Sequence, residues 1–216
     1  FSERLLVHYE SLPEKVKLIE TLDCLIEKQG RFWPDLFLVF ALKRALRRRV
    51  RNLNLNMAAY VVGEGIEMRP LIAAAAEMGF SRICLVSQDE DFLKREKKFL
   101  IRRLVGVQLD TVLTPELTLQ PQDTALLFNS FDLNKHKEYL QDLAYFNFMA
   151  SGGVVVDLHS GGPHQILQEE ALKAQLICVK PVEILLAWWI EVALKTLPKL
   201  AISREQEDEL FASLNS

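Results

Sequence analysis

The stretch Gly63-Glu64-Gly65-Ile66-Glu67-Met68 contains the residue types that most directly suggest a ligand site. It follows an apolar run and precedes an Ala-rich helix, which is the place of a dinucleotide-binding turn. In such a turn, the first glycine allows the tight bend and the second lets backbone approach a pyrophosphate at the helix N-terminus. Met68 takes the third small position, where its side chain should displace the helix or fill the cofactor space. Glu64 and Glu67 would repel a phosphate. The turn is therefore either a cofactor site or, as we favour, a purely structural turn.

A second candidate site follows the next strand, at Ser87, Gln88 and Asp89. An acidic residue near this place can hold an adenosine ribose, whereas an Arg would favour a 2′-phosphate. No Arg occupies the turn, so a non-phosphorylated dinucleotide is the more plausible ligand if one binds. The alternative is that Asp89 caps the following helix. We assign no cofactor firmly. If these turns bind one, it is NAD or NADP.

Two later strand ends complete the candidate site. Asn129 and Ser130 follow the fourth strand, beside the switch point where ligands enter such sheets. Asp157 ends the fifth strand and opens a polar turn that reaches His164 and includes His159 and Ser160. These residues could suggest a nucleophile or a metal site, but they are neighbours on one turn and match no ligand spacing. We expect a turn with a helix cap, and assign no catalytic or metal-binding residue. The candidate cofactor-binding residues are Gly63, Glu64, Gly65, Ile66, Ser87, Gln88, Asp89, Asn129, Ser130 and Asp157.

The elements that must position these residues alternate between short apolar runs and helices from residue 56 onward. Strands that are apolar on both faces indicate a parallel sheet covered by helices on both sides. Right-handed crossovers then favour an α/β, doubly wound, Rossmann-like sheet of order 3-2-1-4-5-6. We expect the Rossmann-like domain over residues 56–200 and a C-terminal helix over 201–216.

Residues 1–55 are predicted to be a helical N-terminal segment that packs on the sheet domain. Leu18, Leu22, Leu25 and Ile26 repeat at helical spacing, and Gly30 ends this first helix. Pro34 suits the first turn of a second helix.

Composition excludes several classes of protein. The chain has 216 residues, of which 50% are hydrophobic and 25% charged, with a net charge of −3. This charge balance argues against nucleic-acid binding, and the apolar stretches are too short to span a membrane. The three cysteines are far apart and form no CxxC pair, so we expect no disulfide and a cytoplasmic location. The chain opens at Phe1 and shows no signal peptide, as a fragment of a longer protein would.

Two segments are candidates for binding a protein partner or a second copy of the chain. The predicted helix over 181–197 is apolar around most of its surface, and it needs cover from the N-terminal helices or from another molecule. The Arg-rich segment 43–51 is either a solvated helix end or a site for an anion or an acidic partner.

Together these pieces resemble the nucleotide-binding half of shikimate dehydrogenase, over roughly residues 32–196. That family's glycine-rich loop is G-A-G-G-A-A or G-A-G-G-A-S, and residues 63–68 keep two of its glycines. The family's N-R-T contains the Arg that reads the NADP phosphate, and residues 87–89 replace it without an Arg. Of the family's N-T/A-T/S-P-L-G-M segment, residues 129–133 keep the Asn and little else.

Two further family segments are altered. The D-x-x-Y-x-P turn becomes residues 157–163, one residue longer and without the Tyr. In the closing M-L-x-x-Q helix, Trp188 replaces the substrate-contacting Gln. The resemblance also implies a substrate domain that supplies a catalytic Lys and Asp, but residues 1–55 contain no S-x-S and no N-V-T-x-P-x-K stretch. We therefore predict a non-catalytic binding or regulatory module, a pseudoenzyme. The alternative is an NAD(P)-dependent oxidoreductase whose catalytic domain lies outside this chain.

Overall fold

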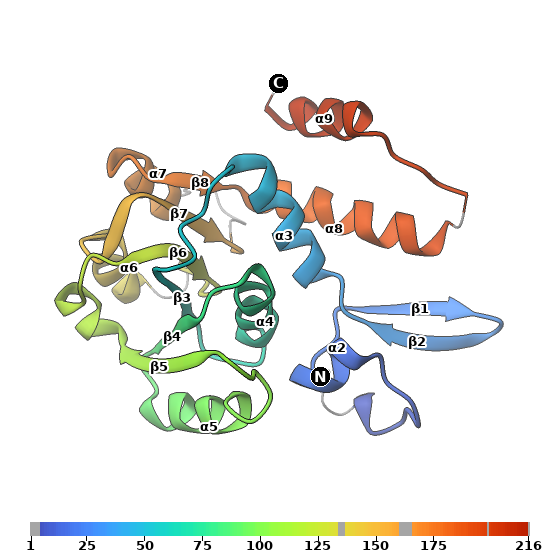
Figure 1. The fold of residues 1–216 in the computed structure, drawn as a ribbon, viewed down its shortest axis with the longest axis horizontal. Coiled ribbons are helices and arrows are strands. Elements are labelled where there is room, and N and C mark those ends of the chain that lie inside the picture. Colours follow the sequence, from blue (N-terminus) through green and yellow to red (C-terminus); the bar gives the residue numbers. More distant parts are fainter. Residues whose placement is uncertain (1–4, 134–136, 160–165, 198, 216) are drawn as a thin grey trace.

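The structure is a computed structural model that describes residues 5–133, 137–159, 166–197 and 199–215. Its centre is a six-stranded parallel sheet (Figure 1). Along the sheet the strands lie in the order β5-β4-β3-β6-β7-β8. Counted from the first strand of this sheet, the order is 3-2-1-4-5-6, which confirms the predicted doubly wound fold. The strands are β3 (Ala58–Val62), β4 (Arg82–Ser87), β5 (Gln108–Leu113), β6 (Thr124–Asn129), β7 (Met149–Asp157) and β8 (Ile177–Val179).

Helices cover both faces of the sheet because the central strands are buried on both faces. All five residues of β3 and all six of β6 are buried, so neither face can be left to solvent. One face carries α4 (Met68–Met78) and α5 (Glu90–Leu100), whereas α6 (Lys137–Ala144) and α7 (Ile166–Lys173) pack on the other. The short 3-10 helix η1 (Thr114–Leu119) follows β5 on the second face.

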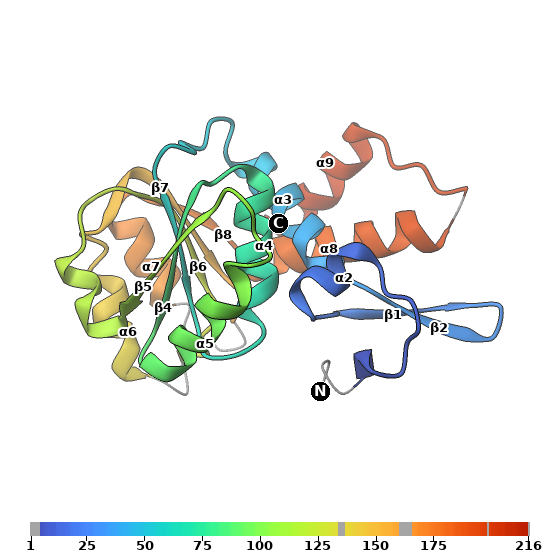
Figure 2. The ribbon, with the colours of Figure 1, turned by 60° about the horizontal axis from the view of Figure 1, so that its bottom comes forward.

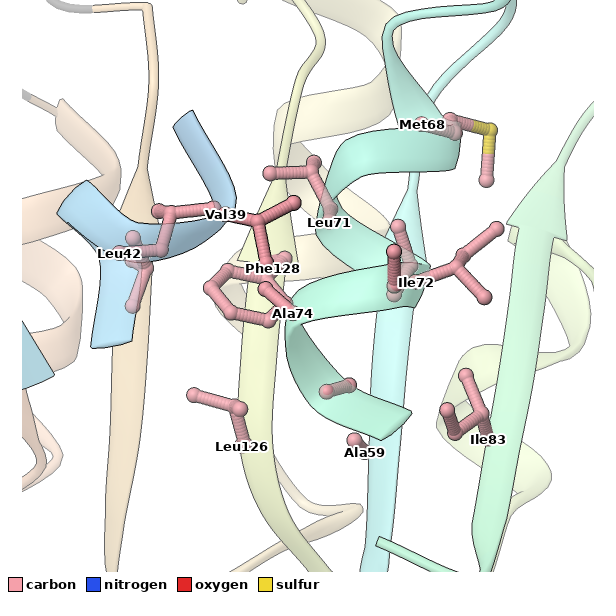
Figure 3. Close-up of a cluster of buried hydrophobic side chains, with 14 of the residues drawn as sticks. Val39, Leu42, Ala59, Met68, Leu71, Ile72, Ala74, Ile83, Leu126 and Phe128 are labelled. Carbon is pink, nitrogen blue, oxygen red and sulfur yellow. The ribbon is translucent and has the colours of Figure 1, made fainter. Parts of the chain in front are cut away.

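The larger core cluster joins the sheet to the N-terminal part of the chain through α4. Val39 and Leu42 lie beside Leu71 and Ala74 of α4, and α4 in turn packs on side chains of three strands, among them Phe128 (Figure 3). Figure 2 shows α4 between the sheet and the N-terminal elements. The N-terminal helix α3 (Leu38–Arg49) therefore shares one hydrophobic core with the sheet.

The prediction that residues 1–55 are helical throughout is wrong between residues 24 and 35. After the short helix α2 (Glu14–Ile19), β1 (Cys24–Lys28) and β2 (Arg31–Asp35) form an antiparallel hairpin. Gln29 and Gly30 both have positive φ, of 53° and 76°, as a two-residue type I′ turn requires. Gly30 thus turns a hairpin rather than ending a helix. Pro34 lies inside β2, where a two-stranded ribbon leaves an edge that tolerates proline.

The end of the chain packs back on α3. Helix α8 (Pro181–Thr196) lies along α3, with Ile184, Ala187 and Ile190 buried. Helix α9 (Arg204–Ala212) and the short η2 (Ser213–Asn215) follow, and Phe211 of α9 is buried in the same core. Leu185 and Trp189 of α8 stay 54% and 57% exposed.

The structure also bears on the cysteines and on the question of membrane-spanning helices. All three cysteines are free thiols in the structure. Within the described ranges, no helix has the length and hydropathy that a bilayer-crossing segment would need.

Candidate functional site

The strand ends that carry the candidate residues meet at one edge of the sheet. Val86, Val62, Asn129 and Asp157 stand in register across β4, β3, β6 and β7. Because the strands are parallel, the turns that follow them lie side by side at the carboxyl edge. This is where open α/β sheets bind ligands.

The first turn is filled by the chain's own side chains. Gly63 is buried, and its N–H donates to the Val86 carbonyl at 3.0 Å. A Cβ atom on Gly63 would come within 2.7 Å of Met68 Cγ and would also clash with the Ser130 hydroxyl. Met68 itself is fully buried at the start of α4. Glycine is needed at position 63 because Met68 and Ser130 occupy the room beside it.

The second glycine of the turn is covered by a carboxylate. Gly65 has a φ of 154°, and a Cβ on it would meet the Glu67 carboxylate, with Oε1 at 2.7 Å. At the same helix start, the Met68 and Arg69 amides donate to the carbonyls of Gly65 and Ile66 at 3.2 and 3.1 Å. Helix N-terminal amides are the groups that normally hold a phosphate. In this chain the Met68 and Arg69 amides are engaged within the turn, and the Glu67 carboxylate lies over Gly65.

Glu64 adds a second negative charge to the same turn. Its side chain is exposed, and its Oε1 accepts a hydrogen bond from the Tyr139 hydroxyl of α6 at 3.2 Å. This bond ties the glycine turn to the opposite face of the sheet. The sequence pattern did not indicate Tyr139, which lies 75 positions away from its partner.

The turn after β4 is organised around the start of α5. The Asp89 carboxylate accepts from the Phe92 amide at 2.8 Å, which confirms the helix-cap interpretation. The buried Ser87 hydroxyl accepts from the Asp89 amide at 3.2 Å, and Gln88 is exposed. Asp89 therefore has a structural partner that accounts for its position.

Asn129 and Asp157 form a buried polar pair between β6 and β7. The Asn129 amide nitrogen donates to Asp157 Oδ1 at 2.9 Å, and its own carbonyl oxygen accepts from the Phe131 amide at 3.1 Å. Asp157 Oδ1 also accepts from the His159 amide at 3.1 Å. Burial raises the pKa of Asp157 to about 6, although these two hydrogen bonds lower it. The pair fixes the ends of the two strands, and the Asp157 carboxyl binds its proton more tightly than an exposed aspartate does.

The remaining candidates are divided between this edge and the rest of the chain. The Ser130 hydroxyl and amide both donate to the Val62 carbonyl at 2.9 Å, so Ser130 closes the edge between β3 and β6. Ile66 is partly buried within the glycine turn, and His159 is exposed. Ser160 and His164 lie outside the described residues. Within the part of the chain that the structure describes, no three His, Cys, Asp or Glu side chains group as metal ligands would.

A partly buried carboxylate, Asp23, was missed by the sequence pattern. It caps α3 from a distance, accepting from the amides of Phe37 at 2.9 Å and Leu38 at 2.5 Å. It also accepts from the Trp188 indole N–H of α8 at 3.1 Å. Burial raises the pKa of Asp23 despite these bonds. Its partners lie 14, 15 and 165 positions away, which no local motif could reveal.

Comparison with known proteins bears on the fold. No family model matches the chain, and no curated protein matches its sequence. Among solved structures, the shikimate 5-dehydrogenase of Thermus thermophilus, in complex with shikimate, superposes with a TM-score of 0.73 and 16% identity. This match covers 100% of the present chain and 76% of the other. Shikimate 5-dehydrogenase of Listeria monocytogenes, in complex with shikimate and NAD, gives 0.71 and 14%, covering 88% and 70%.

A related match carries a different name. The ligand-free 5-ketofructose reductase of Gluconobacter sp. strain CHM43 gives a TM-score of 0.71 and 14% identity, over 92% of this chain and 70% of that one. At these identities the likeness concerns the arrangement of the backbone. The α/β sheet, its strand order and the helices that flank it are those of the shikimate dehydrogenase fold.

Proposed function

We propose that this chain is a non-catalytic binding or regulatory module, built on the shikimate dehydrogenase fold, whose dinucleotide site is closed by its own side chains. One observation carries the proposal: Met68 and Ser130 fill the space beside Gly63 while the Glu67 carboxylate lies over Gly65. A pyrophosphate needs close approach to this backbone and free amides at the helix start. Both requirements are opposed by groups that the chain itself supplies.

The N-terminal elements support the same proposal. The Arg69 guanidinium forms a buried ion pair with Glu96 at 2.8 Å and also donates to the Ile19 carbonyl at 3.3 Å. Glu77 of α4 pairs with Lys15 and Lys43 at 3.2 and 2.7 Å. These contacts hold α2 and α3 on α4, so the N-terminal part of the chain is joined to the sheet domain as one packed body.

The kept glycines of the turn favour one alternative, an NAD(P)-dependent oxidoreductase of the shikimate dehydrogenase type whose catalytic part lies outside this chain. The Listeria monocytogenes protein was solved with shikimate and NAD, so both compounds are the natural probes. We expect no shikimate-dependent reduction of NAD⁺ or NADP⁺ by the isolated chain. Measurable reduction, with first-order dependence on protein concentration, would overturn the proposal. Nucleotide binding without turnover would support the alternative.

A further inference from the structure

A cluster of positively charged side chains lies away from the glycine turn, between α3 and α9. A cavity of about 650 Å³ opens there, and six cationic side chains line it together with three carboxylates. The whole chain, in contrast, has a net charge of −3. The six cations are Lys43, Arg44, Arg47, Arg48, Arg51 and Arg204.

Half of these cations have structural partners. The Arg44 guanidinium pairs with Glu191 of α8 at 2.8 Å and with Glu207 of α9 at 2.7 Å. Arg48 pairs with Asp208 at 2.6 Å and lies over the Phe211 ring. These contacts attach α9 to α3 and α8, and they give each of the three carboxylates of the cavity a cationic partner. Lys43 pairs with Glu77 at 2.7 Å, outside the cavity lining.

The other three cations of the cavity are arginines that make no such contact among the described residues. Among the residues that the structure describes, Arg47, Arg51 and Arg204 have no ion-pair partner, and all three are exposed. The dipole of α3 accounts for Arg47, since cations are favourable in the last turn of a helix. Arg204 has no such explanation. It stands in the first turn of α9, where the dipole of α9 disfavours a cation. Two segments of the chain thus line the cavity with unpaired guanidinium groups, and these three groups give the lining its excess of positive charge.

We propose that this cavity binds a compact oligophosphate, a small molecule with two or more linked phosphate groups, through Arg47, Arg51 and Arg204. Guanidinium groups bind phosphate oxygens in bidentate geometry, and all three of these side chains line the same cavity. The cavity has the size of a small-molecule site. A long polyanion is disfavoured because the exposed Glu205 and Glu209 of α9 would repel it. This inference does not depend on whether the glycine turn is closed.

Isothermal titration calorimetry with inorganic tripolyphosphate, in metal-free buffer of low ionic strength, tests the proposal. The variant R47Q/R51Q/R204Q removes the three unpaired charges. The matched control R95Q/K98Q/R102Q removes three charges at and just beyond α5, leaving the cavity intact. We expect tripolyphosphate to bind at least about tenfold more tightly than orthophosphate, and the cavity variant to lose about tenfold or more, because phosphate–Arg contacts supply the affinity.

The control separates a site from a general charge effect. If the control variant loses as much affinity as the cavity variant, or tripolyphosphate binds no better than orthophosphate, the proposal is overturned. Titration with ATP distinguishes two sources of the same chemistry. Equal affinity for ATP and tripolyphosphate assigns the site to the phosphate chain alone, and tighter ATP binding that the cavity variant also loses assigns it to a nucleotide.

Discussion

The Met68 side chain lies so close to the backbone of Gly63 that a Cβ atom on Gly63 would come within 2.7 Å of Met68 Cγ. The two residues are the first and last of the glycine turn, and they come from β3's end and from α4's first position. In a dinucleotide-binding turn the last position is small, because helix and strand must approach each other closely. Here a fully buried thioether fills that place, and the helix still packs on the sheet.

The closed turn predicts that smaller, uncharged side chains will open it. We expect Met68→Ala combined with Glu64→Ala and Glu67→Ala to improve the binding of NAD(H) or NADP(H), because the changes remove bulk and negative charge at the helix N-terminus. Removing the buried Met68 should cost about 2–5 kcal/mol of stability. Met149→Ala, which removes a buried methionine from the other core cluster, is the matched control. Fluorescence titration of NADH into each variant measures the effect; equal affinities would contradict the closed turn.

The pKa of Asp157 makes a prediction about pH. The folded value of about 6 lies above the ordinary value of 3.8, so the folded chain binds this proton more tightly than the unfolded chain does. The contribution of Asp157 to the free energy of unfolding therefore falls as pH rises from about 4 to about 6, and it stays low above that range. Asp157→Asn keeps an oxygen to accept from Asn129 and His159 but cannot ionise.

Urea unfolding of both proteins between pH 4.5 and 7.5 checks this sign. The stability of Asp157→Asn relative to the unmodified chain should rise by up to about 2 kcal/mol over this range, because about 1.5 pH units lie between the starting pH and the folded pKa of about 6, at 1.36 kcal/mol per unit. A relative stability that stays constant or falls over this range would contradict the raised pKa of Asp157.

Much of the fold could be predicted because the physical signal was local. Runs such as 58–62 and 125–128 are apolar on both faces, and only a sheet covered on both sides accommodates them. The Asp89 cap could be predicted for the same reason, since its partner Phe92 is three residues away. The parallel order then followed from the handedness of crossovers.

The hairpin at 24–35 could not be predicted because two signals concealed it. Leu18, Leu22, Leu25 and Ile26 mimic one face of a helix, yet Glu20, in the left-handed region with a φ of 52°, ends α2 before Leu22. The turn uses Gln29-Gly30 rather than the Asn-Gly or Asp-Gly pairs that announce a type I′ turn. The capping role of Asp23 could not be predicted for another reason. Its capping partners and Trp188 are brought to it only by tertiary packing.

Asp23 is predicted to stabilise the junction of the hairpin, α3 and α8. Asp23→Ala leaves the Phe37, Leu38 and Trp188 N–H groups without their acceptor, and we expect a loss of about 2 kcal/mol or more. Asp23→Asn keeps one acceptor oxygen and should lose less. Trp188→Phe removes the indole donor together with part of the packing of that ring, so its loss of stability is an upper bound on the contribution of that bond. Urea unfolding followed by circular dichroism ranks the three variants; an Asp23→Ala protein as stable as the parent would contradict the cap.

The exposed face of α8 predicts association. Leu185 and Trp189 remain more than half exposed although the buried face of α8 packs on α3. Exposed apolar side chains at a helix face favour contact with a partner or a second copy. We expect Trp189→Glu to leave stability within about 0.5 kcal/mol, because the side chain is exposed, and to abolish concentration-dependent association. Light scattering over a range of concentrations measures both proteins. A strictly monomeric parent chain would remove the homodimer from consideration.

Direct titration of the unmodified chain tests most sharply whether the glycine turn binds a dinucleotide. NAD⁺, NADH, NADP⁺ and NADPH should each be titrated by calorimetry and thermal shift, in parallel with R47Q/R51Q/R204Q, so that binding in the α3–α9 cavity is recognised. A ligand at a hundred times its Kd would stabilise the fold by about 2.7 kcal/mol. We predict no such stabilisation at the turn. Micromolar binding that persists in R47Q/R51Q/R204Q would contradict the closed site.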